Sequence, residues 1–143
     1  MLMFQNHVMD EMCDQAKEEY PLECCGVLLG KREKNMRIVF EIIPIQNTAE
    51  PDERKTHFFI QPFEFLRIEK TAVEKELEIV GFYHSHPDYE ERASKEDEAH
   101  MIFSYSYPII SVRKGRSILV ASYENTSQSG FFIQRENLIT QED

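Results

Sequence analysis

The first apolar pattern along the chain is helical. Val8, Met12 and Ala16 recur every four residues, and polar or acidic residues fill most of the positions between them. This spacing is typical of an amphipathic helix that buries one stripe of its surface. The sequence therefore predicts a helix over residues 4–20, which stops before Pro21 because the residue preceding a proline disfavours helical geometry.

Most later apolar runs are shorter and rich in β-branched and aromatic residues, so they predict strands. Two of them flank a turn-like segment and predict a hairpin. Pro62 opens a second helical pattern, and a third follows the polar loop after Pro87. After the first helix we expect strands at 24–30, 37–45 and 57–60, a helix at 63–77, a strand at 79–86, a helix at 94–103, and strands at 109–113, 117–123 and 130–134.

This order of elements predicts an α+β fold. Helices are mixed with neighbouring antiparallel strands instead of alternating strictly with them, which favours an α/β/α layered arrangement around one curved mixed sheet. A chain of 143 residues has the size of one domain and shows no internal repeat. We therefore expect residues 1–143 to form a single domain.

Composition and charge exclude several classes of protein. No apolar run reaches the ~20 residues of a membrane helix, and residues 1–6 lack the features of a signal peptide. A net charge of −10 disfavours contact with nucleic acid. Cys13, Cys24 and Cys25 are odd in number, which is typical of reduced thiols. We expect a cytoplasmic protein with no nucleic-acid or membrane partner.

The stretch His84-Ser85-His86-Pro87 carries the strongest chemical signal. Side chains two apart on a strand project from one face, so both imidazoles point the same way at the strand's end. On the following helix, Ser94 and Asp97 are three apart and share a face. Two histidines and one carboxylate leave a fourth position for water, which is a catalytic zinc pattern.

Each part of this pattern has an ordinary structural interpretation. Ser94 and Asp97 also fit a helix N-cap, which is the better interpretation of that pair alone. A lone acid such as Glu23 is usually a surface residue. Cys24 and Cys25 suggest a thiol nucleophile, but buried cysteines in an apolar strand behave as small hydrophobic residues.

Two neighbouring features stay open as well. His100 lies one turn after Asp97 and could face the site, although a solvated histidine is the better interpretation. The acidic loop at 88–91 is expected to be solvated, yet it flanks the metal ligands and could select a basic substrate surface.

Taken together, the motifs resemble the JAMM (MPN-plus, Mov34/PAD-1) zinc metalloprotease family. Its signature is a distant Glu, then H-x-H-P, then a short loop and S-x-x-D, and here it reads Glu23, His84-Ser85-His86-Pro87 and Ser94-Lys95-Glu96-Asp97. The segment Pro-Leu-Glu-Cys-Cys-Gly-Val-Leu-Leu-Gly at 21–30 is similar to prokaryotic stand-alone members. One departure is Gln15-Ala16, where many such members carry His-Ala. The resemblance implies an MPN/JAB-type, cytidine-deaminase-like domain.

The resemblance also implies roles for individual residues. His84, His86 and Asp97 would bind one Zn²⁺ per chain, Glu23 would be the general base toward the zinc-bound water, and Ser94 would stabilise the oxyanion. The implied substrate is a peptide or isopeptide bond after the C-terminal Gly-Gly of a ubiquitin-like or sulfur-carrier protein. A scaffold module without turnover and a zinc hydrolase acting on a small amide are the alternatives. The oligomeric state is left open.

Overall fold

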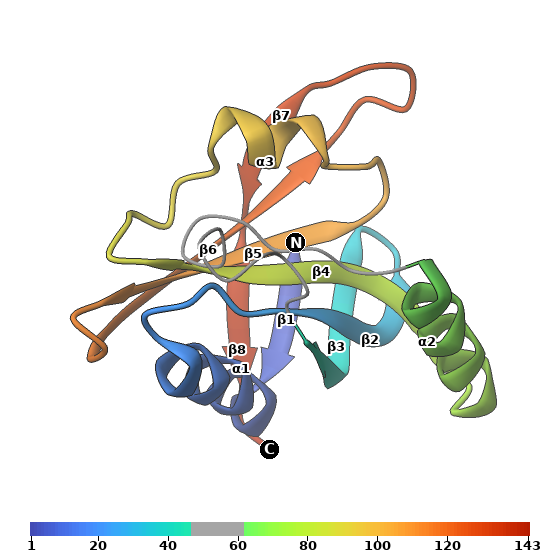
Figure 1. Cartoon of the computed structure of the whole chain (residues 1–143). Helices are drawn as coiled ribbons and strands as arrows, with labels where there is room; N and C mark the ends of the chain where they lie inside the picture. The colour runs from blue at the N-terminus through green and yellow to red at the C-terminus, as the bar shows by residue number, and fades with distance from the viewer. Residues whose placement is uncertain (47–61) are drawn as a thin grey trace.

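A computed structural model of the chain describes residues 1–46 and 62–143. In that part of the chain there are eight strands and three helices (Figure 1). The elements are β1 (Leu2–Gln5), α1 (Asn6–Glu19), β2 (Cys25–Glu33), β3 (Met36–Ile45), α2 (Pro62–Glu74), β4 (Glu78–Pro87), α3 (Lys95–Ala99), β5 (Ser106–Arg113), β6 (Ser117–Asn125), β7 (Ile133–Glu136) and β8 (Leu138–Gln141).

All eight strands form one mixed sheet in the order β7-β6-β5-β4-β2-β3-β1-β8. The expected hairpin of β2 and β3 is present, and β4 pairs antiparallel with β2 but parallel with β5. β7 and β8 lie at opposite ends of this order, yet only Asn137 separates them in the chain. The sheet must therefore curl until its edges meet. A mixed sheet with helices is confirmed, whereas its barrel-like closure differs from the layered arrangement expected.

Helices α1 and α2 pack on opposite faces of the central strand β2. Successive side chains of a strand alternate between faces, so Leu28 joins the buried cluster under α1 while Val27 and Leu29 join the cluster under α2. The predicted stripe of α1 is fully buried: Val8, Met12, Ala16. β2 is therefore packed on both of its faces, so the residues at its two ends are attached to a rigid strand.

Gly26 allows a close approach within this core. A Cβ atom at this position would lie 2.2 Å from the Tyr83 ring, so only glycine leaves room for the aromatic side chain of β4. The Tyr83 hydroxyl in turn donates a hydrogen bond to Gln15 of α1. The residue just before the histidine pair is thereby locked to both β2 and α1.

Several expected boundaries were wrong. The first helix begins at Asn6, because Leu2 and Phe4 alternate as buried residues of β1. The strand β8 was missed. The helix expected over 94–103 is only α3, since His100 leaves helical geometry at φ −103° and ψ 0° and the N–H of Ile102 donates to Tyr107 Oη at 2.7 Å. The strand expected at 130–134 is β7. The strand expected at 57–60 lies outside the described residues.

None of the described helices has the length and apolar character needed to cross a membrane.

Candidate metal centre

The two histidines of the motif lie at the carboxyl end of β4. His84 is opposite Cys25 of β2 and beside Ile109 of β5, so the strand is fixed on both sides at this point. The Nε2 atoms of His84 and His86 are 3.1 Å apart, as expected for side chains two apart on one face of a strand. The predicted same-face arrangement is confirmed.

Asp97 of α3 completes a triangle with the two imidazoles. Its Oδ1 lies 3.1 Å from His84 Nε2, and its Oδ2 lies 3.1 Å from His86 Nε2. Ligand atoms on a tetrahedral ion with bonds of about 2.0–2.1 Å are separated by about 3.3 Å. The three side chains therefore form a group able to hold a metal ion, since one ligand atom from each lies within 4.8 Å of the others.

A backbone carbonyl fixes the tautomer of His86. The Glu90 C=O lies 2.7 Å from His86 Nδ1, and a carbonyl can only accept, so Nδ1 carries the proton. The lone pair of neutral His86 is then on Nε2, the atom that faces His84 and Asp97. Such an outer hydrogen bond to a backbone carbonyl is the usual way in which a metal-ligating histidine is oriented.

The N-cap interpretation of Ser94 and Asp97 is also correct. Ser94 Oγ accepts the Asp97 N–H at 3.0 Å, and Asp97 Oδ2 accepts the Ser94 N–H at 2.9 Å, which together form a capping box. The cap and the histidine contacts do not compete, because a carboxylate has several acceptor positions. The helix start aims the Asp97 carboxylate at the imidazoles.

Burial and hydrogen bonding give these groups unusual acidities. Burial alone would raise the pKa of Asp97, but the imidazoles of His84 and His86 that face its carboxylate hold that pKa far below its ordinary value. Burial lowers the pKa of His84. Asp97 is therefore ionised and His84 is neutral near pH 7, which are the protonation states in which both groups bind a metal.

Glu23 lies in the segment between α1 and β2 and is only 3% exposed. Burial raises its pKa to about 8, and the charges of His86 and Asp97 act on it as well. The residue predicted from sequence as the general base is thus a buried carboxyl group within electrostatic reach of His86 and Asp97.

Comparisons with known proteins assign the chain to a family. Residues 5–125 match the family of prokaryotic homologs of the JAB domain. The chain belongs to this family. Tail tip assembly protein K of Escherichia phage N15 is 35% identical over 92 residues, which are 64% of this chain but only 32% of the phage protein. The chain thus spans about a third of the length of that curated relative.

Two solved structures have the same fold as this JAB domain. A protein of Desulfitobacterium hafniense is 30% identical, with a TM-score of 0.84 over 100% of this chain and 94% of the other. A protein of Salinibacter ruber is 25% identical, with a TM-score of 0.73 over 97% and 91% of the two chains.

Other candidate residues of the JAB domain do not belong to the group formed by His84, His86 and Asp97. Cys24 and Cys25 are fully buried, and burial raises the pKa of the Cys24 thiol to about 12, which argues against a thiol nucleophile. His100 is exposed just after α3, where its N–H donates to the Asp97 carbonyl. In the acidic loop, Tyr89, Glu90 and Asp88 are exposed.

Two contacts around the ligands were not foreseen from sequence. The contact of the Glu90 carbonyl with His86 could not be predicted from residue type, because every residue has a backbone carbonyl. Ser111 of β5 donates from its hydroxyl to the Tyr89 carbonyl, which anchors the loop that carries Glu90. A serine among the apolar residues of 109–112 was the available signal for this anchor.

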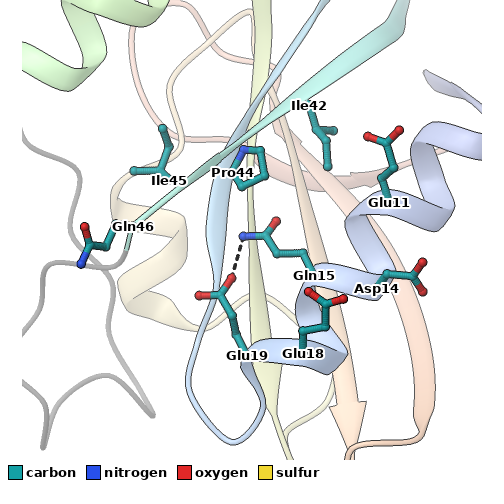
Figure 2. Close-up of a pocket in the computed structure, with 9 residues that line it drawn as sticks. All are labelled: Glu11, Asp14, Gln15, Glu18, Glu19, Ile42, Pro44, Ile45 and Gln46. Atoms are coloured by element: carbon teal, nitrogen blue, oxygen red, sulfur yellow. Dashed lines mark hydrogen bonds between the residues drawn. The ribbon is translucent and has the colours of Figure 1, made fainter.

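A separate groove lies between α1 and β3 (Figure 2). It has a volume of about 500 Å³, and neither Glu23 nor a metal ligand lines it. Its apolar side comes from Ile42, Pro44 and Ile45 of β3. Gln15 lies in the groove and donates to Glu19 at 2.8 Å. The lining acids are Glu11, Asp14, Glu18 and Glu19.

Proposed function

We propose that this JAB domain is a zinc-dependent peptidase or isopeptidase. His84, His86 and Asp97 hold the zinc, Glu23 is the general base, and Ser94 is the oxyanion donor. The observation that carries the proposal is the convergence of His84, His86 and Asp97, in which the two Nε2 atoms lie 3.1 Å apart and each lies 3.1 Å from one oxygen of the Asp97 carboxylate. Glu23 adds a buried carboxyl group beside them. Three protein ligands leave a coordination position open, which distinguishes catalytic from structural zinc sites.

Zinc, when bound, polarises a substrate carbonyl and lowers the pKa of water. Glu23 then accepts the proton of the attacking water and returns it to the leaving amine. A carboxyl group with a pKa near neutrality suits both steps, although a divalent cation close by lowers that pKa. Ser94 uses an oxygen lone pair to accept the Asp97 N–H, so its hydroxyl proton remains available to a developing oxyanion.

The proposed substrate is the bond after the C-terminal Gly-Gly of a ubiquitin-like or sulfur-carrier protein, in the cytoplasm. The support for it is the family to which the chain belongs, together with the grouping of His84, His86 and Asp97 in one place. A hydrolase acting on a small amide would use the same metal and base. It would differ only in the size of the substrate that can reach the metal.

A non-catalytic assembly module is the second candidate. The name of the phage relative describes tail tip assembly, and the matched segment is a minor part of that protein. The intact ligand triangle argues against this candidate, since a scaffold has no need for three convergent donors and a buried acid.

The test is cleavage of a defined fusion. A ubiquitin-fold carrier ending in Gly-Gly is joined to a short C-terminal peptide and incubated with zinc-loaded protein, with chelator-treated protein, and with zinc-loaded His84→Ala/His86→Ala. Mass spectrometry that finds release after the second glycine only with zinc-loaded wild type supports the proposal. One bound zinc per chain without cleavage of the fusion, but with hydrolysis of a simple acyl amide, favours the small-amide hydrolase. Absence of zinc binding after reconstitution favours the assembly module.

A further inference from the structure

Ser85 lies between the two histidine ligands but points to a different partner. It is fully buried, and its neighbours in the strand project from the opposite face. Its hydroxyl oxygen accepts the backbone N–H of Cys24 at 2.8 Å. That N–H belongs to the peptide unit that joins Glu23 to Cys24, so the hydroxyl of Ser85 holds the backbone directly next to the base.

This contact replaces part of the regular ladder between β2 and β4. In an antiparallel ladder, the two residues of a hydrogen-bonded pair exchange two N–H···O=C bonds. The N–H of Ser85 does donate to the Cys24 carbonyl, at 3.0 Å. The N–H of Cys24, however, donates to the side chain of Ser85. In this pair, the Ser85 hydroxyl thus takes the place of the Ser85 carbonyl as the acceptor of the Cys24 N–H. The replacement lies where the chain runs from Glu23 into β2.

The inserted hydroxyl has a geometric consequence for the base. Because a peptide unit is planar, an acceptor that fixes the Cys24 N–H also fixes the orientation of the Glu23 carbonyl and limits the direction of the Glu23 side chain. The same residue is bonded covalently to His84 and His86. Ser85 thus links the base to two metal ligands through one side chain in the rigid centre of the sheet.

We propose that Ser85 is a positioning residue that sets the Glu23 carboxylate relative to the metal ligands. The proposal rests on the proposed function, since it concerns the base of that reaction. Small displacements of a reacting group cost up to about 10²-fold in rate. Loss of the hydroxyl is therefore expected to lower kcat while leaving zinc binding and KM in place, because no ligand atom and no substrate contact is removed.

The experiment compares zinc-loaded wild type with Ser85→Ala, Ser85→Thr and the control Ser106→Ala. Ser106 is an equally buried serine of the same sheet, whose hydroxyl accepts from Arg37 at 3.1 Å instead of contacting the base segment. The readouts are zinc per chain, kcat and KM on the Gly-Gly fusion, and zinc-loaded crystal structures that give the distance from the Glu23 carboxylate to the metal.

We expect Ser85→Ala to lose about 10–100-fold in kcat with full zinc content, with KM within about twofold. Ser85→Thr, which keeps the hydroxyl, should recover most of this loss, and Ser106→Ala should behave as wild type. A wild-type kcat in Ser85→Ala, or a loss that follows lost zinc, overturns the proposal. If Ser85→Ala fails to fold, Ser85→Cys takes its place, because it keeps the size with a weaker acceptor.

The crystal structures separate this inference from the proposed function. If wild type binds zinc but cleaves no substrate, the proposed function fails while the positioning role is still decided by geometry. A Glu23 carboxylate that moves away from the metal in Ser85→Ala then supports the role of Ser85, and an unmoved carboxylate refutes it.

Discussion

The metal centre and the groove between α1 and β3 both gather acidic side chains, but they differ in what holds those side chains. In the metal centre, Asp97 accepts from the backbone of Ser94 and faces two imidazoles whose strand is fixed on both edges. In the groove, Glu11, Asp14 and Glu18 are exposed on one side of a helix. Side chains that converge on one point and are held there by backbone contacts therefore distinguish a candidate metal site from a solvated acidic surface.

The largest effect is expected from Asp97, where metal binding and helix capping can be separated. Asp97→Ala removes the carboxylate ligand and one half of the capping box, so zinc should be lost and stability should fall by about 1 kcal/mol. Asp97→Asn keeps an oxygen that can accept the Ser94 N–H but is a poor, neutral zinc ligand. Zinc content by elemental analysis and chemical denaturation of the metal-free proteins measure the two effects.

For Asp97→Asn we expect a stability between those of Asp97→Ala and wild type, because the cap is kept while the carboxylate charge that His84 and His86 stabilise is lost. We also expect a loss of zinc affinity exceeding the roughly 10–100-fold typical of outer contacts. Full zinc occupancy in Asp97→Asn at limiting metal would mean that Asp97 serves α3 alone, and the contrast between the two regions would disappear.

The next effect concerns turnover without metal loss. Glu23→Gln keeps the shape of the side chain but cannot accept a proton, so kcat should fall by about 10²–10⁴-fold on the Gly-Gly fusion. The zinc content should stay at the wild-type level, since Glu23 is not among the three ligands. Steady-state kinetics and elemental analysis on the same preparation measure both quantities. Unchanged kcat in a zinc-loaded variant would remove Glu23 from the role of base.

A smaller effect is expected on the stability of the metal-free protein with pH. The pKa of Glu23 is raised by burial to about 8 in the folded chain, against about 4.3 when unfolded. Between these values the folded state holds a proton that the unfolded state releases, so stability is present at low pH and is lost as pH rises toward 8. The slope is at most about 1.4 kcal/mol per pH unit.

The variant Glu23→Gln isolates this contribution from those of its neighbours. Burial lowers the pKa of His84, which opposes the slope below about pH 6.5, because there only the unfolded state gains a proton. The lowered pKa of Asp97 contributes stability that is lost only as pH falls below about 4. Denaturation of both proteins in chelator at pH 5 to 8 should show a steeper decline for wild type. Parallel curves would contradict the buried, protonated state of Glu23.

The sequence predicted the grouping of His84, His86 and Asp97 better than it predicted the elements that carry them. His84 and His86 are two residues apart, and any strand places such side chains on the same face whatever packs around it. Their proximity could therefore be predicted from the local sequence. The end of α3 could not be found in this way, since the N–H of Ile102 bonds to Tyr107, a residue of the next strand. The hydroxyl of Ser85 is similar, because its partner Cys24 is 61 residues away. Local sequence patterns therefore predict which side chains share a face of an element. Contacts with residues far along the chain determine where the element ends and which partners its side chains bind.

The smallest effect is expected in the groove. Asp14 lies three residues after Glu11 and four before Glu18 on the exposed side of α1, and like charges at these spacings destabilise a helix by about 0.2–0.5 kcal/mol per pair. Asp14→Asn should therefore raise the free energy of unfolding by up to about 1 kcal/mol at low ionic strength, and less in 1 M salt, where the charges are screened. Denaturation at two salt concentrations measures this gain, while zinc content and kcat serve as controls that should not change. A fall in kcat in Asp14→Asn would show that the groove takes part in the reaction, and its acids would then belong with those of the metal centre.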